Sequence, residues 1–461
     1  MAKIKIHIKD LFDIPTAVIY NPDSYAVSTD VCIDSRKVKK NSIFFAIKGE
    51  KLDGHKFIKQ AIENGAGAVI INKNRLRYFD DVDLTIIAVK DTTKAYGDLA
   101  NIVRKKSKFK VISITGSNGK TGTKEILAAI LSEKYKVVKT ESNNNNHIGV
   151  PLTIFSAASN TEILVLEHGT NHFGEIKYTA EIAEPDYAII TNIGNSHLEF
   201  LENTEKVYEE KSALFESVSL GGKVFVNNDD KIIKKNTKNF NNKILYGFKN
   251  KPDVKGKIVS YDALSYPEIS IQYKNRKIQA QVPLLGEVNA KNLLSAVSVA
   301  FELKLNKREI LTGIKKLSAF NGRLKPVFVN DSMIIDDTYN SNPESVTAAI
   351  SVLKRVKKYK RKILILGDMF ELGKSSVELH KMLSEMIIKN KNIEVFLIGK
   401  YMKKLFNEIQ EVKTNASYYS SRKSLAKKIK SENFFNTVVL IKGSRGLKME
   451  EFITLTKENM S

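Results

Sequence analysis

The chain has 461 residues, 42% of them hydrophobic, which is enough for about three domains that each bury an apolar core. No apolar run reaches the length of a signal peptide at the amino terminus or of a membrane span later on, so we expect a cytoplasmic protein without membrane insertion. The single cysteine, Cys32, excludes an internal disulfide and a zinc site built from cysteines.

The formal net charge is +23, with 74 Lys and Arg against 51 Asp and Glu. Such an excess is typical of proteins that bind nucleic acid. Here it is nearly all lysine spread from end to end, and the cluster at residues 354–362 has the pattern of a solvated helix face leading into a strand. We therefore favour a lysine-rich surface around sites for small anions and expect no nucleic-acid partner. A basic ATPase that acts on nucleic acid is the alternative from a different class.

The order of predicted elements indicates an α/β fold in three domains. Residues 1–106 form a small α/β unit that ends in a basic stretch. Residues 107–318 alternate short apolar strands with helical patterns, which is typical of a parallel sheet covered on both faces; strands are expected at residues 111–115, 163–166, 187–190 and 223–226. Residues 253–282 alternate apolar and polar side chains as antiparallel strands do. Residues 319–461 repeat the α/β pattern, with strands expected at residues 362–366, 395–398 and 437–441.

A glycine-rich turn separates the strand at residues 111–115 from the helical pattern that follows. It consists of Gly116, Ser117, Asn118, Gly119, Lys120 and Thr121. The backbone N–H groups of such a turn surround an anion and the helix dipole adds to the attraction, which predicts a nucleoside triphosphate site. We expect Lys120 at the outer phosphates and Thr121 at Mg²⁺. Ile114 stands where the usual phosphate-loop spacing has glycine, so the loop is a variant, and an ordinary strand-to-helix turn is the alternative.

Polar residues also follow the neighbouring strands, where open α/β sheets bind their ligands. Glu167 closes the strand at residues 163–166, and a carboxylate there suits Mg²⁺. His197 follows the strand at residues 187–190 and is a candidate metal ligand or proton donor. Either side chain alone is more often structural or solvated. The parallel strand before Glu167 and the following Gly169-Thr170-Asn171 favour a ligand role for this carboxylate, whereas His197 by itself is a weak indication.

Seven motifs, in order, resemble the Mur ligases, ATP-dependent enzymes that form amide bonds in the peptide of the peptidoglycan precursor. The resemblance spans the whole chain and is strongest to the branch that adds D-alanyl-D-alanine. The asparagine-rich tract is one of the motifs, and the Asp-Asn-Pro-Arg signature of the branch that adds the third residue is absent from the sequence. The motifs lie at residues 34–57, 115–125, 143–153, 191–199, 336–345, 366–373 and 442–446.

The resemblance implies the nature of each domain and the reaction. Residues 1–106 would bind a UDP-sugar, residues 107–318 would be a phosphate-loop ATPase-like domain that binds ATP, and residues 319–461 would be Rossmann-like. ATP and two Mg²⁺ ions are implied as cofactors, and UDP-MurNAc-tripeptide and D-Ala-D-Ala as substrates of a monomer. In these enzymes the peptide carboxylate attacks the γ-phosphate of ATP, and the incoming amine attacks the resulting acyl phosphate. Positioning and charge neutralisation would carry the rate.

For catalysis the resemblance points to Lys120, His197 and Lys211. Lys120 would stabilise the transferring phosphoryl group. Thr121 and Glu167 would hold one Mg²⁺, and His197 would help to hold a second. Lys211 aligns with a lysine that is carbamylated in the family, which turns a cation into an anionic metal ligand. From the residues alone, Lys211 reads as a surface lysine on a helix.

Further contacts are implied for the nucleotide and for the substrates. Asn289 and Asn292 match a segment near adenine, whose edge suits amides. Arg323 and Asp337 would reach the nucleotide once the domains close and exclude water. The implied substrate contacts are Ser35 and Arg36 for uridine diphosphate, Asn144 and Asn145 for the muropeptide, and Lys442, Ser444 and Arg445 from the last domain.

Four residues depart from the family pattern. His168 replaces methionine, Val288 replaces histidine, Ala213 replaces glutamate and Gly122 replaces threonine. None removes an expected metal or phosphate ligand, so we expect activity. A catalytically silent relative stays open as an alternative, as does another ligase of the superfamily, such as the third-residue Mur ligase or a folylpolyglutamate-synthetase-like enzyme. The sequence does not distinguish diaminopimelate from lysine as the third residue of the tripeptide.

Overall fold

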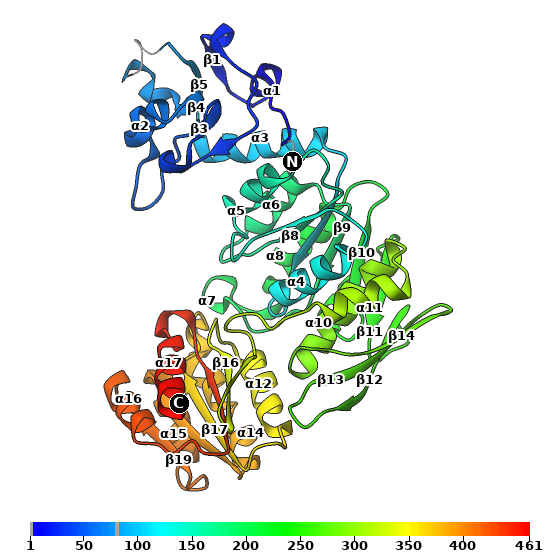
Figure 1. Cartoon of the computed structure of the whole chain (residues 1–461), viewed down its shortest axis with the longest axis vertical. Coiled ribbons are helices and arrows are strands. Elements are labelled where there is room, and N and C mark those ends of the chain that lie inside the picture. Colours follow the sequence, from blue (N-terminus) through cyan, green and yellow to red (C-terminus); the bar gives the residue numbers. More distant parts are fainter. Residues whose placement is uncertain (1–2, 79–82) are drawn as a thin grey trace.

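The computed structural model describes residues 3–78 and 83–461. Within these described residues, three sheets follow one another along the chain, with five, nine and six strands. Figure 1 shows the three domains in chain order from top to bottom, with the first and third attached to opposite ends of the central one. The predicted class of three α/β domains is confirmed. The predicted limits after residues 106 and 318 fall between the sheets and stay predictions.

The first domain is built on a sheet of order β1-β5-β4-β3-β2, in which β1 pairs antiparallel and the other pairings are parallel. Because β2 to β5 run in one direction, the segments that follow them meet at one edge of the sheet. The strands are β1 (Val18–Tyr20), β2 (Val31–Cys32), β3 (Ser42–Phe45), β4 (Ala66–Asn72) and β5 (Thr85–Val89). The helices are α1 (Ile8–Phe12), α2 (Ile58–Glu63) and α3 (Thr92–Lys106), with 3-10 turns η1 (Pro22–Ser24), η2 (Ser35–Lys37), η3 (Gly54–Phe57) and η4 (Lys73–Tyr78).

Helix α3 joins the first domain to the central one. Its buried Tyr96 and Leu99 belong to the same apolar core as Ile154 and Ile182 of the central domain. Helix α3 lies so close to the central-domain helix that carries Tyr178 that a Cβ at Gly97 would lie 2.6 Å from the Tyr178 hydroxyl. The two domains therefore share one continuous core.

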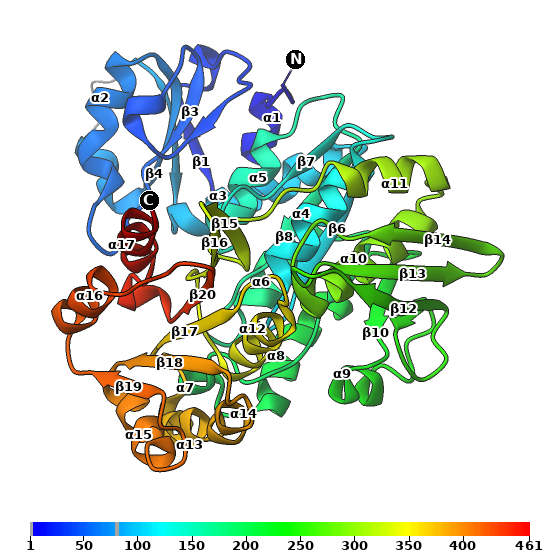
Figure 2. The same cartoon turned by 60° about the horizontal axis from the view of Figure 1, so that its bottom comes forward.

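The central sheet has the order β14-β13-β12-β11-β10-β9-β6-β8-β7, parallel from β7 to β12 and antiparallel from β12 to β14. The predicted antiparallel excursion is therefore confirmed, and in Figures 1 and 2 it extends away from the other two domains. The strands are β6 (Lys110–Thr115), β7 (Val137–Lys139), β8 (Ile163–Glu167), β9 (Tyr187–Ile190), β10 (Lys223–Asn227), β11 (Lys243–Gly247), β12 (Val254–Tyr261), β13 (Pro267–Tyr273) and β14 (Arg276–Gln281).

Helices cover the parallel part of this sheet. On one side, α10 packs against α4 and shares an apolar core with it. The helices are α4 (Lys120–Leu131), α5 (Gly149–Ser156), α6 (Glu175–Ala183), α7 (Leu198–Leu201), α8 (Thr204–Glu216), α9 (Lys231–Asn236), α10 (Gly286–Glu302) and α11 (Lys307–Lys315). The carboxyl ends of β6, β8 and β9 carry the segments singled out from the sequence.

The third domain has a sheet of order β15-β16-β20-β17-β18-β19, parallel except for the pairing of β15 with β16. Its strands are β15 (Lys325–Val329), β16 (Ser332–Asp337), β17 (Arg361–Gly367), β18 (Ile393–Ile398), β19 (Ala416–Tyr419) and β20 (Thr437–Lys442). Its helices are α12 (Pro343–Arg355), α13 (Ser376–Lys381), α14 (Ser384–Lys389), α15 (Lys400–Ile409), α16 (Arg422–Lys430) and α17 (Glu450–Met460), with 3-10 turns η5 (Gly373–Ser375) and η6 (Arg445–Leu447). Among the described residues, no helix has the length and apolar character to cross a membrane.

Candidate functional site

The glycine-rich turn links β6 to α4, as the sequence predicts. Gly116 and Gly119 have φ of 144° and 83°, a region that favours glycine. Neither position has room for a side chain. A Cβ at Gly116 would lie 2.0 Å from Thr191 Oγ1, and one at Gly119 would lie 2.5 Å from Asn292 Oδ1. The turn is therefore fixed by close backbone approach as well as by conformation.

The segment after β9 supports the turn from one side. The Ser117 hydroxyl accepts from the Gly194 backbone N–H at 2.9 Å. The Asn118 backbone N–H donates to Asn192 Oδ1 at 3.0 Å, and the Asn192 amide returns a bond to the Asn118 carbonyl at 2.9 Å. These contacts hold the loop that the sequence assigns to phosphate.

Lys120 folds back over the turn. Its Nζ donates to the Gly116 carbonyl oxygen at 2.7 Å. Burial lowers the pKa of Lys120, the charge of Arg323 lowers it further, and Glu167 opposes the shift. Two cations thus face the turn against one carboxylate, so this end of the sheet favours an anionic ligand.

Four side chains from separate parts of the chain meet beside Lys120. Glu167 Oε1 accepts from the Thr121 hydroxyl at 3.1 Å and from Asn145 Nδ2 at 2.9 Å. Arg323 Nη2 lies 2.9 Å from Thr121 Oγ1, and its guanidinium stacks 4.1 Å from the ring centre of Tyr339. Arg323 therefore already contacts the phosphate loop in this domain arrangement.

Lys211 lies on α8 with 1% of its surface exposed, so the reading of a surface lysine is wrong. Burial, and then the charge of Lys120, lowers its pKa to about 7, with Glu210 opposing. Burial and the neighbouring charge of Lys120 thus both favour the neutral form of this amine. This is an unusual position for a lysine and a frequent sign of a functional site.

His197 is the residue that precedes α7, as its N-cap, and has a left-handed φ of 55°. Its Nδ1 lies 2.7 Å from Glu371 Oε2 of the third domain, and this contact is the main cause that lowers the pKa of Glu371. The observed partner of His197 is therefore this carboxylate. Among the described residues, no group of three or more His, Cys, Asp or Glu side chains could by itself hold a metal ion.

Asn289 and Asn292 lie on α10, close to the phosphate loop. Asn289 Nδ2 donates to the Leu285 carbonyl at 2.8 Å, which is a helix-end contact. Asn292 packs against the turn, and a Cβ at Gly122 would lie 2.6 Å from its Nδ2. The departure to Gly122 thus matches the space that Asn292 occupies. Val288 is partly buried and packs against the apolar core of the third domain, which suits an apolar side chain at this departure.

The departure at His168 is a buried, neutral histidine whose two ring nitrogens both have hydrogen-bond partners. The Thr179 hydroxyl donates to the Glu175 carbonyl at 3.0 Å, so it accepts from His168 Nδ1 at 2.9 Å, and Nε2 accepts from the Ser113 hydroxyl at 2.8 Å. Burial lowers the pKa of His168 to about 3. The imidazole joins β6, β8 and α6 directly behind Glu167.

The third domain contains a buried ion pair at the carboxyl ends of β16 and β20. Lys442 Nζ lies 2.7 Å from Asp337 Oδ2 and donates to the Asn340 carbonyl at 2.8 Å. Burial raises the pKa of Asp337, and Lys442 opposes that shift. The Ser444 hydroxyl accepts from the Phe370 backbone N–H at 2.7 Å. Arg445 is 67% exposed and its guanidinium lies 5.9 Å from the Tyr339 ring centre.

Two further residues of the third domain contact the central domain, one at the phosphate loop and one at the segment after β9, and the sequence did not point to either of them. Asn342 caps α12 and donates from Nδ2 to Asn118 Oδ1 at 2.9 Å. Glu344 Oε1 accepts from the backbone and side-chain nitrogens of Asn195 at 3.0 and 2.8 Å. Both residues belong to the Asn-Pro-Glu helix start at residues 342–344, a signal that lies within the motif at residues 336–345.

In the first domain, the expected uridine diphosphate residues have partners of their own. The Ser35 hydroxyl donates to Gln60 Oε1 at 2.6 Å, and Arg36 makes two bonds of 2.9 Å to Asp34. At the same edge of the sheet, beyond β3, β4 and β5, lies an open cavity of about 530 Å³. Its charged lining is formed by Lys48, Asp53, Arg75, Arg77, Lys90 and Asp91.

Comparison with known families gives three matches, one to each domain, and all three family models are of Mur ligases. The family model described as the Mur ligase family, catalytic domain, matches residues 28–104. The Mur ligase middle domain matches residues 114–300. The Mur ligase, glutamate ligase domain, matches residues 322–445.

Similar proteins and structures cover nearly the whole chain. The UDP-N-acetylmuramoyl-tripeptide–D-alanyl-D-alanine ligase of Bacillus subtilis is 32% identical over 98% of both chains, and that of Escherichia coli is 30% identical over 99% of both. A crystal structure of MurF from Acinetobacter baumannii aligns with a TM-score of 0.88 at 26% identity, covering 99% of this chain and 100% of that one. The MurF ligase from Thermotoga maritima in complex with ADP aligns with a TM-score of 0.81 at 26% identity, covering 94% and 97%.

Proposed function

The chain belongs to the Mur ligase family, and we propose that it joins D-alanyl-D-alanine to UDP-MurNAc-tripeptide at the expense of ATP, in peptidoglycan precursor synthesis. The observation that carries this proposal is the meeting of Lys120, Thr121, Glu167 and Arg323 at the carboxyl end of parallel strands. This cluster has the charges and hydroxyl needed to hold and activate a triphosphate. The full-length similarity to relatives of one named activity supports the choice of substrates.

The reaction needs charge neutralisation more than covalent help from the protein. The terminal carboxylate of the tripeptide attacks the γ-phosphorus and ADP leaves; the amine of the dipeptide then attacks the acyl carbon, and phosphate leaves with the oxygen that bridged carbon and phosphorus. Lys120 and Arg323 face the phosphates and neutralise the charge that develops on them. Arg323 and Asn342 come from the third domain, so the docked arrangement completes the site and excludes water.

Magnesium fits the oxygen donors of the site. The Thr121 hydroxyl and Glu167 Oε1 are hard ligands 3.1 Å apart, and Mg²⁺ prefers such oxygens together with water and phosphate oxygens. We propose that these two residues hold one ion and that His197 helps to hold a second. When bound, the ions would neutralise phosphate charge and polarise the transferring group.

Lys211 is proposed to act as a carbamate. Burial lowers the pKa of its amine to about 7, which increases the neutral fraction near neutral pH, and only the neutral amine attacks carbon dioxide. The addition forms a nitrogen–carbon bond and releases one proton, which leaves an anion beside the cation of Lys120. That charge pairing favours the carbamate over the buried ammonium.

The remaining site residues are assigned to adenine, to the acceptor peptide and to the ligands that the third domain contacts. Asn289 and Asn292 are proposed at adenine, and Asn144 and Asn145 at the peptide of the acceptor. Asp337, Lys442, Ser444 and Arg445 are proposed to receive the nucleotide and the dipeptide from the third domain. Because every one of these groups comes from one chain, we propose that the enzyme works as a monomer. We also propose that its domains end after residues 106 and 318.

The uridine diphosphate end of the substrate is proposed at the edge of the first sheet that carries Ser35 and Arg36. The neighbouring cavity supports this placement because Lys48, Arg75, Arg77 and Lys90 outnumber its two carboxylates, as a diphosphate site requires. Arg75→Ala should raise the KM for UDP-MurNAc-tripeptide and leave that for ATP unchanged. An equal rise in both would place the diphosphate elsewhere.

One assay tests the proposed function. Phosphate release is measured with ATP, Mg²⁺, D-Ala-D-Ala and UDP-MurNAc-tripeptide, leaving out one component at a time and comparing tripeptides that end in diaminopimelate and in lysine. We expect release only in the complete mixture. Release that ignores the dipeptide, or that responds to DNA or RNA instead, would overturn the proposal.

A further inference from the structure

Lys124 is a buried cation to which the functions above give no role. It lies on α4, three residues after Thr121, and none of its surface is exposed. An ammonium removed from water costs several kcal/mol unless oxygens surround it, and an apolar side chain would fill the same face of the helix more cheaply. Packing alone therefore does not account for a lysine at this position.

Oxygens from three elements surround the Lys124 ammonium. Its Nζ donates to the Thr140 carbonyl at 2.6 Å and lies 3.4 Å from the Ser142 carbonyl, both in the segment after β7. It lies 3.0 Å from Glu125 Oε1 on α4 and 3.7 Å from Glu167 Oε2 at the end of β8. One ammonium thus connects the phosphate-loop helix α4, the strand β8 that ends at Glu167, and the asparagine-rich segment, residues 140–145.

The two oxygens of Glu167 point to different partners. Oε1 receives the hydroxyl of Thr121 and the amide of Asn145. Oε2 is buried, has no hydrogen-bond partner, and has Lys124 as its cationic neighbour. Lys124 therefore faces the rear oxygen as a charge at 3.7 Å, while Oε1 is directed at the nucleotide side of the site.

The same ammonium also orients Asn145. The carbonyls of Thr140 and Ser142 belong to the stretch of chain that leads to Asn145, whose own carbonyl accepts from the Gly169 backbone N–H at 2.8 Å. A shift of the Lys124 contacts would move Asn145 and Glu167 together. The nucleotide side and the acceptor side of the site would then change as one unit.

We propose that Lys124 is a positioning residue that couples the Thr121–Glu167 pair to the asparagine-rich segment, residues 140–145. The inference rests on the proposed function for its catalytic consequence, and its structural part stands without it. Groups that orient a metal-binding carboxylate typically change affinity or activity by about 10- to 100-fold when they are removed. The change should fall on Mg²⁺–ADP binding and on the KM of both the nucleotide and the tripeptide.

Lys139 provides a matched control. It pairs with the same Glu125, but 31% of its side chain is exposed. The variants are Lys124→Met, which keeps the length without the charge, Lys124→Gln, which keeps a donor for Thr140, and Lys139→Met. Two quantities are measured for each: amide hydrogen exchange of the ligand-free full chain and calorimetric binding of Mg²⁺–ADP.

For Lys124→Met, we expect exchange at residues 140–145 and at Gly169 to rise about tenfold while the other sheets keep their protection, and Mg²⁺–ADP binding to weaken about 10- to 100-fold. Lys124→Gln should lie between this variant and the wild type, and Lys139→Met should change neither quantity more than about twofold. Should Lys124→Met fail to fold, Lys124→Gln decides by the same criteria.

Unchanged exchange at residues 140–145, a rise spread over all three sheets, or an equal effect of Lys139→Met would overturn the coupling role. The exchange experiment contains no substrate. A wild-type protein that released no phosphate in the omission assay would therefore count against the proposed function and leave the positioning result to be judged separately.

Discussion

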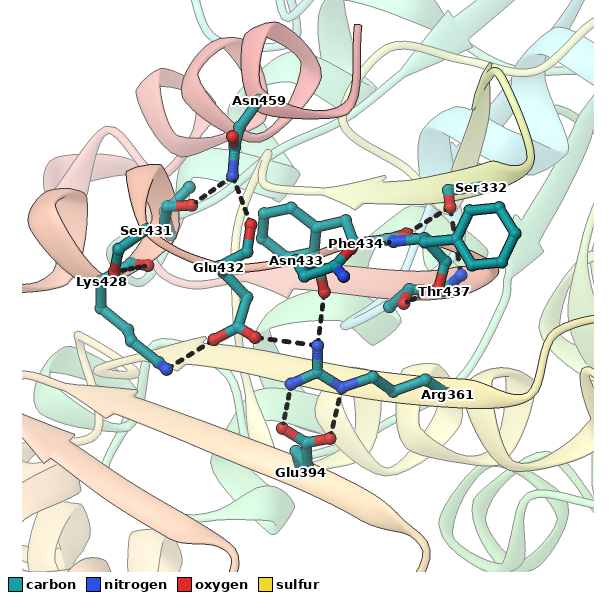
Figure 3. A network of polar contacts seen from close by, with 12 residues as sticks. Ser332, Arg361, Glu394, Lys428, Ser431, Glu432, Asn433, Phe434, Thr437 and Asn459 are labelled. Atoms are coloured by element: carbon teal, nitrogen blue, oxygen red, sulfur yellow. Dashed lines mark hydrogen bonds and ion pairs between the residues drawn. The ribbon is translucent and has the colours of Figure 1, made fainter.

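Two charged regions of the molecule differ in how deeply their charges are buried and in how those charges are balanced. At the domain junction, Lys124, Lys211 and Lys442 are almost fully buried, and the main charged neighbour of Lys211 is another lysine. At the far side of the third domain, Arg361 makes two bonds of 2.5 Å to Glu394 and lies 2.8 Å from Glu432, which in turn pairs with Lys428 at 2.6 Å (Figure 3).

The difference lies in what completes each region. Every charge of the Figure 3 network has an opposite partner within the fold, and the Arg361 and Glu394 side chains are about 30% exposed. At the junction, Lys124 and Lys442 also have carboxylate partners, but Lys120, Lys211 and Arg323 gather around a turn built for anions, so the charge balance there is completed by a ligand. Charge removal at the junction should therefore affect function and stability strongly, whereas removal at the far network should affect stability weakly and function not at all.

Lys211→Ala carries the largest expected effect. Without the lysine no carbamate forms, and the rate of the complete reaction should fall at least about 100-fold. A short-chain carboxylic acid, which can occupy the vacated space with an anionic oxygen, should restore part of it. The control is Lys206→Ala on the same helix, whose side chain is 41% exposed and pairs with Glu202. Undiminished activity of Lys211→Ala would refute the carbamate role.

Lys442→Met should destabilise the third domain. It leaves Asp337 buried without its cation, and breaking a buried pair in this way costs roughly 3–5 kcal/mol. Because the pKa of Asp337 is already raised by burial, Asp337→Asn in the same chain should recover much of the loss. Urea unfolding of the single and double variants measures this, with exposed Lys457→Met as the control. Additive losses in the double variant would contradict a coupled pair.

His168→Met changes the pH dependence of stability. The pKa of His168 is about 3 in the folded chain, below the ordinary 6.5, so only the unfolded chain takes up a proton between these values. The wild type should therefore lose about 1.4 kcal/mol per pH unit from this group as pH falls through that window, and keep its full contribution above it.

The methionine variant should lack this slope and lose about 1 to 2 kcal/mol at pH 7.5, where the Ser113 hydroxyl loses its partner. His172→Met, at a histidine with 61% of its side chain exposed, serves as the control. Denaturant unfolding at pH 5 and pH 7.5 measures how the free energy of unfolding depends on pH in both variants and in the wild type. An identical pH slope in His168→Met and the wild type would show that another group sets the acid sensitivity.

Arg361→Met should have the smallest effect. Its pKa is raised by the Glu394 and Glu432 hydrogen bonds, but solvent screens a partly exposed network, so we expect a loss of about 1 kcal/mol. Ligase activity should match the wild type at 25 °C. A large loss of activity would mean that the far side of the third domain communicates with the junction, and the contrast between the two regions would fail.

The sequence was sufficient for the parts of the molecule that depend on local pattern. Apolar runs located β6, β8, β9 and β17, and the glycine spacing located the phosphate loop. The contacts that join the domains could not be predicted from the sequence, because they depend on how elements that are far apart in the chain approach one another. Nothing local to Lys124 or His168 distinguishes a buried polar side chain from an exposed one, and His197 could not be known to meet Glu371. Burial of Lys211 likewise depends on the packing of α8.

The central claim is that the chain activates a carboxylate through an acyl phosphate. The most direct measurement uses UDP-MurNAc-tripeptide with both oxygens of its terminal carboxylate labelled with ¹⁸O, together with ATP, Mg²⁺ and D-Ala-D-Ala, and mass analysis of the phosphate released. The account predicts phosphate that carries one label per molecule, formed only when the dipeptide is present. Unlabelled phosphate would show that water, and not the peptide carboxylate, attacks the γ-phosphorus, and would contradict the account.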